Sequence, residues 1–138
     1  MSYDLTVYLQ RSNMPSPADW HSSIVAAGFP VALDTDFDVD AFSGFLPCPV
    51  GGEISGFEYD ALAVSSEEVE ALELAPGTDF SVQFRIGSRP LELVSALAAS
   101  SVLAAVSGGS LQDPQSGESI PAHEAVSWAK AQLAALGA

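Results

Sequence analysis

Two stretches of the chain alternate apolar and polar residues at every second position, which is the pattern of a strand with one buried face. The segment FSVQFRI at residues 80–86 places four large apolar side chains on one face and three polar ones on the other. The segment YDLTVYL at residues 3–9 repeats the pattern and is rich in Tyr, Thr and Val, which favour strands. We expect both segments to be strands, the N-terminal one opening the sheet.

Turn residues predict two hairpins. In SGFLPCPVGGEISGFEY, at residues 43–59, the Gly-Gly pair separates two apolar arms, as in a two-residue hairpin loop. Pro47 and Pro49 remove the N–H donors from one side of the first arm, so we expect an edge strand there. The second arm continues as a strand to Val64. Residues 110–120, SLQDPQSGESI, predict the second hairpin, with its turn at Asp-Pro-Gln-Ser-Gly.

Four segments carry helix signals. Residues 17–28 have apolar side chains at helical spacing, with proline in the first turn and glycine at the end. Ser65 and Glu68 form a capping box before a short helix. Residues 90–106 are apolar almost all round, so we expect this helix to lie in the core. Residues 121–136 carry one apolar stripe, as in an amphipathic helix.

The order of these elements is strand, helix, several strands, long helix, hairpin and helix. Consecutive hairpins with few strand–helix–strand units predict the α+β class. The 138 residues fit one domain, and no internal repeat or linker divides them. We therefore predict a single α+β domain over residues 1–138. Its mixed or mainly antiparallel sheet has about five or six strands, with three main helices packed on it.

Residues 34–42, DTDFDVDAF, carry an aspartate at every second position. An EF-hand calcium loop needs glycine at its sixth position and glutamate at its twelfth, and neither register of this segment supplies them. In an extended segment the four aspartates share one face, while Phe37 and Val39 lie on the other. We interpret it as a half-buried extended segment with an acidic outer ladder. An extended loop is the alternative, because aspartate is a poor strand former.

Charge narrows the classes of partner. The chain has 18 acidic residues against four basic ones, a net charge of −14. Nucleic-acid binding relies on Lys and Arg that displace counterions, and anionic membranes attract the same residues, so both partners are disfavoured. A cationic protein is attracted instead, and such attraction accelerates association. We expect the partner to be a basic protein, and we expect neither a nucleic acid nor a membrane as a partner.

The acidic residues are also unevenly distributed. Twelve of the 18 lie between Asp34 and Asp79, where no Lys or Arg occurs. Solubility alone is one explanation, but one-sided charge destabilises a fold by self-repulsion, so we interpret it as a surface that is used. Phe45, Phe57 and Tyr59 are candidate apolar anchors, although such side chains on strands are usually buried. The predicted partner-binding residues are Asp34, Asp36, Asp38, Asp40, Glu58 and Asp60.

Cys48 is the only cysteine, so no internal disulfide forms, and it shares a strand face with Leu46 and Val50. We interpret it as a small buried hydrophobe. The N-terminus MSYDLTVYLQRS lacks a basic region followed by an apolar core, which argues against a signal peptide. The longest apolar run, residues 91–106, is shorter than the ~20 residues of a membrane span. A cytoplasmic protein is expected.

Motifs that fix an enzyme activity are not found in the sequence. It contains no G-x-S-x-G, no G-x-x-x-x-G-K-[ST] and no G-x-G-x-x-G, so hydrolase elbows, P-loops and dinucleotide turns find no support. His123 and Glu124 match the start of the zinc-binding motif H-E-x-x-H, but Ser127 occupies the position of the second histidine. His21 is the other imidazole, and we predict no metal site and no cofactor. An acidic pair in a cleft stays open as a small hydrolase-like alternative.

Three features together resemble a known class of protein. These are the run SGFLPCPVGGEISGFEY, the long Ala-rich helix ending in Gly-Gly, and DPQSGESI before the last helix. They are similar to small stand-alone bacterial proteins, some of which resemble immunity proteins of polymorphic toxin systems. The resemblance implies an inhibitor that binds and neutralises a basic toxin or enzyme domain. The alternatives are the small enzyme and a non-catalytic structural subunit.

Overall fold

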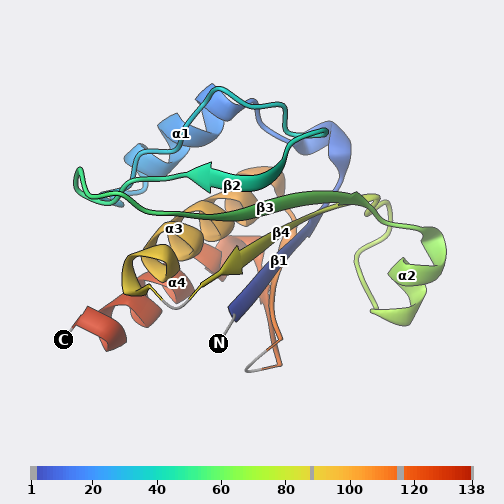
Figure 1. Cartoon of the computed structure of the whole chain (residues 1–138). Helices are drawn as coiled ribbons and strands as arrows, with labels where there is room; N and C mark the ends of the chain where they lie inside the picture. Colours follow the sequence, from blue (N-terminus) through green and yellow to red (C-terminus); the bar gives the residue numbers. More distant parts are fainter. Residues whose placement is uncertain (1–2, 88, 115–116, 138) are drawn as a thin grey trace.

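The computed structural model describes residues 3–87, 89–114 and 117–137. The chain forms one α+β domain around a six-stranded antiparallel sheet of order β2-β3-β4-β1-β5-β6, as predicted from the sequence (Figure 1). The strands are β1 (Tyr3–Leu9), β2 (Ser43–Pro47), β3 (Gly56–Ala63), β4 (Phe80–Ile86), β5 (Ser110–Asp113) and β6 (Glu118–Pro121). The helices are the 3-10 helix η1 (Arg11–Asn13) and α1 (Pro17–Ala26), α2 (Ser66–Ala71), α3 (Pro90–Ser107) and α4 (Ala122–Gly137).

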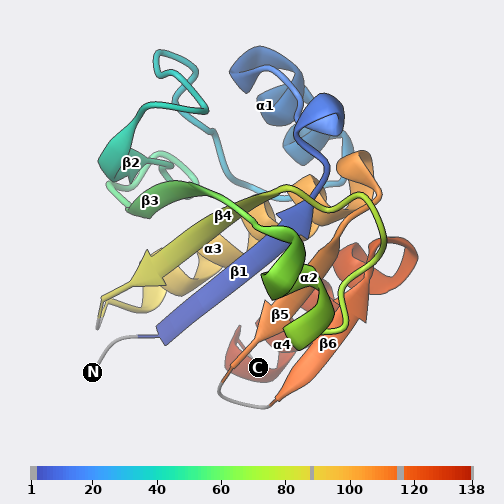
Figure 2. The same cartoon turned by 90° about the vertical axis from the view of Figure 1, so that its right-hand side faces the viewer.

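The sheet has one covered face and one open face. Helices α1, α3 and α4 lie on the covered face, with α3 in contact with the other two helices and with the central strands. The short helix α2 lies on the opposite side, in front of β1 in Figure 2. On that side the strand register aligns polar residues in rows, such as Gln83, Thr6 and Gln112 across β4, β1 and β5. We call this side the open face.

The covered face is the core. The register of β1 and β4 places Leu5 opposite Phe84 and Val7 opposite Val82, and all four side chains are fully buried. This confirms the alternation predicted for residues 80–86. Each such side chain contributes about 1.5–3 kcal/mol by leaving water, so the pattern of these two strands fixes which face of the sheet meets the helices.

Helix α3 is the central helix predicted from its composition. Every residue from Ser95 to Ala104 is buried. By length and composition α3 could cross a membrane, but 61% of it is buried within the protein, as in the core helix of a globular domain. The indole N–H of Trp20 donates to the Ala99 carbonyl at 3.0 Å, and Ser95 Oγ donates to the Cys48 carbonyl at 2.7 Å. These bonds tie α1 and the segment after β2 to α3.

Strand β2 is an edge strand, as the prolines predict. Its hairpin loop turns at Gly51 and Gly52, whose φ values of 56° and 85° need glycine. The outer edge is also covered: the backbone N–H groups of Ala32 and Asp34 donate to the carbonyls of Pro49 and Pro47, at 3.0 and 3.1 Å. The sequence predicted that this edge lacks donors, and the structure shows that its carbonyls are used by the preceding loop.

Residues 34–42 do not form a strand, which corrects the interpretation as an extended acidic ladder. The carboxylate of Asp34 accepts from the N–H of Asp36, and that of Asp38 from the N–H of Asp40, each at 2.9 Å. The Phe42 N–H donates to the Asp38 carbonyl at 2.9 Å and closes a turn. Aspartate favours loops through these local bonds, so the alternative of a loop is correct.

The structure also confirms the predicted start of α2, the second hairpin and the C-terminal helix. Ser65 Oγ accepts from the Glu68 N–H at 3.2 Å and starts α2, as the capping box predicts. In the hairpin between β5 and β6, Gly117 has φ 75° and its N–H donates to the Asp113 carbonyl at 2.8 Å. Residues 115–116 of the predicted turn lie outside the described residues. Helix α4 covers the predicted amphipathic segment, with Ala129 buried and Val126 half-buried.

Candidate functional site

The six predicted partner-binding acids lie around the β2 edge of the sheet and do not share one face. The four aspartates belong to the loop before β2, whose Phe37 ring packs against Tyr59 on the covered side, with 5.2 Å between ring centroids. Glu58 and Asp60 project from β3 on the open face and alternate with the buried residues Phe57 and Tyr59. The acids therefore wrap around the edge of the sheet.

Asp40 differs from the other acids because it is paired with a base. The Arg11 guanidinium donates to both carboxylate oxygens of Asp40, and its Nη2 lies 2.5 Å from Oδ2. These bonds hold the pKa of Asp40 below its ordinary value. The backbone N–H of Arg11 also donates to the Asp79 carboxylate at 2.7 Å. The sequence missed this pair, because Arg11 is 29 residues from Asp40 and outside the base-free stretch.

Three candidate apolar anchors have different environments. Phe57 and Tyr59 are each 1% exposed, and the Tyr59 hydroxyl donates to the Val39 carbonyl at 2.5 Å, so both belong to the core. Phe45 is 45% exposed and lies directly opposite Glu58 in the β2–β3 register. A Cβ at Gly56 would lie 2.6 Å from the Phe45 ring. The ring therefore rests on the bare glycine backbone while its other side meets solvent.

Cys48 and the two histidines lack the surroundings of a catalytic or metal site. Cys48 is fully buried, and burial raises the pKa of its thiol to about 12. His21 Nδ1 accepts from the backbone N–H of Leu33 at 3.1 Å, which secures the loop after α1. The His123 side chain is 81% exposed and lies beside Glu124. Within residues 3–87, 89–114 and 117–137 no three His, Cys, Asp or Glu side chains gather in a metal-binding group.

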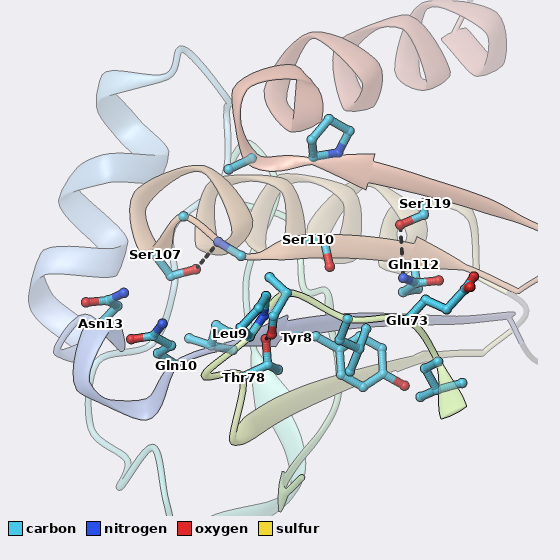
Figure 3. A pocket seen from close by; sticks show the side chains of 18 of the residues that line it. Tyr8, Leu9, Gln10, Asn13, Glu73, Thr78, Ser107, Ser110, Gln112 and Ser119 are labelled. Carbon is cyan, nitrogen blue, oxygen red and sulfur yellow. Dashed lines mark hydrogen bonds between the residues drawn. The ribbon is translucent and has the colours of Figure 1, made fainter. Parts of the chain in front are cut away.

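A groove on the open face was not predicted from the sequence. It lies between the chain that follows α2 and the strands β1, β5 and β6, and its volume is about 590 Å³ (Figure 3). Tyr8 forms part of its floor, and Gly108 and Gly109, after α3, form part of its wall. We call it the Tyr8 groove. Its polar lining side chains are Tyr8, Gln10, Asn13, Glu73, Thr78, Ser107, Ser110, Gln112, Ser119 and His123.

The side chains of this groove are mostly neutral hydrogen-bonding groups. The Gln112 amide donates to Ser119 Oγ at 2.9 Å across the β5–β6 pair. Tyr8 is half-buried, and burial together with the nearby Glu68 carboxylate raises the pKa of its hydroxyl. Glu73 is the one carboxylate in the described lining. This groove therefore does not supply the carboxylate pair that the hydrolase-like alternative needs.

Glu73 occupies an unusual backbone position. It follows the C-cap of α2 with φ 54°, in the left-handed region where glycine is usual. The Leu74 N–H donates to the Val69 carbonyl at 2.9 Å, and the Glu73 N–H donates to the Glu70 carbonyl at 3.3 Å. This pair of bonds defines a Schellman motif with glutamate in the glycine position. The side chain at this position lines the Tyr8 groove.

Sequence reasoning missed the groove because its walls come from distant parts of the chain. Tyr8, Glu73 and His123 span most of the sequence, and no motif joins them. The usable signal was local: Ser110 and Gln112 alternate with the buried Leu111, which marks them as residues of an open sheet face.

Comparisons of the whole chain with protein-family models, curated proteins and solved structures give no match, so the resemblance to immunity proteins stays a prediction.

Proposed function

We propose that this protein is an acidic binding module that holds a basic protein partner at the β2 edge of its sheet. The proposed contact surface, the acidic edge, consists of Asp34, Asp36 and Asp38 in the loop before β2, of Glu58 and Asp60 on β3, and of the exposed ring of Phe45 on β2. Asp40 borders this surface, but its carboxylate is engaged by Arg11. The observation that carries the proposal is Phe45, a half-exposed aromatic side chain placed directly opposite Glu58.

The combination of an exposed aromatic side chain with charged residues is typical of protein–protein interfaces. Exposed ion pairs contribute only about 0–1 kcal/mol each, so carboxylates alone do not make a stable complex. Aromatic anchors surrounded by polar groups carry most of the affinity in measured interfaces. Because the Phe45 ring rests on Gly56, part of the entropy cost of ordering it is already met in the free protein. The aspartates then steer Lys and Arg side chains of the partner toward this anchor.

The class of partner follows from charge and from the resemblance described above. A protein with a net charge of −14 attracts basic domains, and basic toxin or enzyme domains are the targets of the immunity proteins that the chain resembles. We therefore propose a cytoplasmic inhibitor that neutralises such a domain by covering its cationic surface. In this role the protein carries out no reaction of its own and needs no cofactor.

The proposal is tested by affinity capture from an extract of the native organism, followed by mass spectrometry. The wild-type protein is compared with Phe45→Thr and with an acidic-edge variant carrying Asp34→Asn, Asp36→Asn, Asp38→Asn, Glu58→Gln and Asp60→Asn. Asparagine keeps the oxygen acceptors that Asp34 and Asp38 offer to the loop backbone. We expect the wild type to retain a basic protein that both variants lose, because each variant removes one half of the surface.

A control variant removes three negative charges from other parts of the surface. Glu67→Gln, Glu70→Gln and Glu124→Gln neutralise three exposed carboxylates on α2 and α4, away from β2. This control should retain the partner as the wild type does. Equal retention by the acidic-edge variant, or equal loss in the control, would show that the partner does not recognise the acidic edge.

A further inference from the structure

We propose that the Tyr8 groove is a binding site for a neutral, hydroxyl-rich small molecule, a saccharide of one or two rings. The groove lies on the open face near β5 and β6, whereas the acidic edge surrounds β2 at the opposite end of the sheet. The inference is therefore independent of the proposed protein partner. Its volume of about 590 Å³ lies within the range of small-molecule sites, about 300–1,000 Å³.

The hydrogen-bonding chemistry of the lining selects the class of ligand. Hydroxyl side chains such as Tyr8 and Ser119, and amide side chains such as Gln112 and Asn13, can both donate and accept. Among the described residues the Tyr8 hydroxyl makes no hydrogen bond, although its side chain is half-buried. Groups of this kind match a ligand whose own groups donate and accept, as sugar hydroxyls do. Phosphates only accept and ammonium groups only donate, so they use such a lining incompletely.

The charge of the groove argues against an anionic ligand. The described lining of the groove contains no Lys or Arg, and the whole chain carries −14, so an anionic ligand would be repelled without a local counter-charge. Glu73 is the single carboxylate, and it can accept from two neighbouring hydroxyl groups at once. Hydrolysis of a glycosidic bond generally needs two carboxyl groups, so the lining indicates binding without cleavage.

Glu73 supplies a further observation. A glycine at this position would relieve the cost of its left-handed backbone. Glu73 is unfavourable at the helix end, but it places a carboxylate at the groove. Its replacement therefore tests whether the carboxylate contacts a ligand. Loss of binding without loss of stability is the result that separates a ligand contact from a structural role.

The experiment follows backbone amide shifts by ¹⁵N NMR while a series of sugars is added. The probes are glucose, N-acetylglucosamine, maltose and cellobiose, with glucose 6-phosphate and glucosamine as anionic and cationic counterparts of glucose. We expect at least one neutral sugar to give saturable shifts with a millimolar dissociation constant, centred on Tyr8, Gly109 and Gln112. Where that sugar is glucose, its phosphate should bind at least about tenfold more weakly.

Variants decide whether the groove is the site. Glu73→Gly and Gln112→Ala should each weaken binding of that sugar about tenfold or more, while the melting temperature of Glu73→Gly stays level or rises. Glu67→Gln removes one charge from α2, the helix that precedes Glu73, outside the groove, and should bind as the wild type does. The proposal is overturned if no neutral sugar gives saturable shifts, if glucose 6-phosphate or glucosamine binds more tightly than every neutral sugar, or if both groove variants bind normally.

Discussion

Cys48 shows how burial changes the chemistry of one side chain. The sequence predicted a buried thiol from its strand face, and the side chain is fully buried. Its carbonyl accepts from Ser95 Oγ, which also lies 2.7 Å from Ser55 Oγ. The thiol is neutral over the ordinary pH range because burial penalises the thiolate. Cys48 therefore acts as a packing residue.

This burial predicts a loss of stability in alkali. The thiol pKa is 9.0 in the unfolded chain and about 12 in the folded one, so its contribution is complete below pH 9. As pH rises from 9 toward 12 only the unfolded chain loses the proton, and the free energy of unfolding falls by about 1.4 kcal/mol per pH unit. Urea unfolding at pH 8 and pH 10 should show a smaller fall for Cys48→Ala than for the wild type.

Comparison of the two slopes isolates the thiol from other groups. Cys48→Ala lowers stability at every pH by leaving a small cavity. The quantity to compare between the two proteins is therefore the change in the free energy of unfolding from pH 8 to pH 10. Tyr59, whose pKa is also raised by burial, contributes in the same direction in both proteins, mainly above pH 10. Parallel pH curves for the two proteins would contradict a buried neutral thiol.

At the scale of elements, alternation, capping and turn residues predicted most of the structure. Strand β4, the β2–β3 hairpin and α3 follow from the spacing of apolar residues and from glycine pairs, because each signal is local. Residues 34–42 were misread as a ladder, since alternation does not reveal that Asp34 and Asp38 bond to their own loop backbone. The pairing of Arg11 with Asp40 was also out of reach, because only the fold brings η1 to this loop.

The edge hairpin depends on a close approach that can be tested. Gly56 begins β3, and a Cβ built on it would lie 2.3 Å from the Leu46 carbonyl oxygen and 2.6 Å from the Phe45 ring. Since the first of these atoms is backbone, Gly56→Ala must displace β2 relative to β3. We expect a loss of about 1–3 kcal/mol in the free energy of unfolding, measured by urea denaturation.

A second substitution separates the two close contacts. Combining Gly56→Ala with Phe45→Ala removes the ring but leaves the backbone oxygen in place. Most of the loss attributed to Gly56→Ala should therefore remain when measured against Phe45→Ala alone. A fully restored stability would assign the clash to the ring and would show that the strands themselves are not forced apart.

At the scale of the whole molecule, the sheet carries two different surfaces at its opposite ends. The β2 end is acidic with one exposed aromatic ring, whereas the β1–β5–β6 end forms a groove of neutral polar groups. Composition predicted the acidic character, and the order of the predicted elements gave the class of fold. The groove was not predictable, because it depends on how the chain after α2 crosses strands that are distant in sequence.

The net charge makes association with a basic protein sensitive to salt. Attraction between exposed charges extends over a Debye length, which shrinks from about 30 Å at 0.01 M salt to about 8 Å at 0.15 M. The acidic edge contributes five of the carboxylates that remain without a Lys or Arg partner in the described structure. Removing these five should reduce long-range steering more than removing carboxylates elsewhere.

The most direct test of the proposed function is the association rate with the captured basic partner, measured by stopped-flow over that range of salt. For the wild type we predict a rate that falls steeply as salt rises, since steering is screened. The acidic-edge variant should associate more slowly and lose most of this dependence, while the α2 and α4 control keeps it. An unchanged rate and salt slope in the acidic-edge variant would contradict the account.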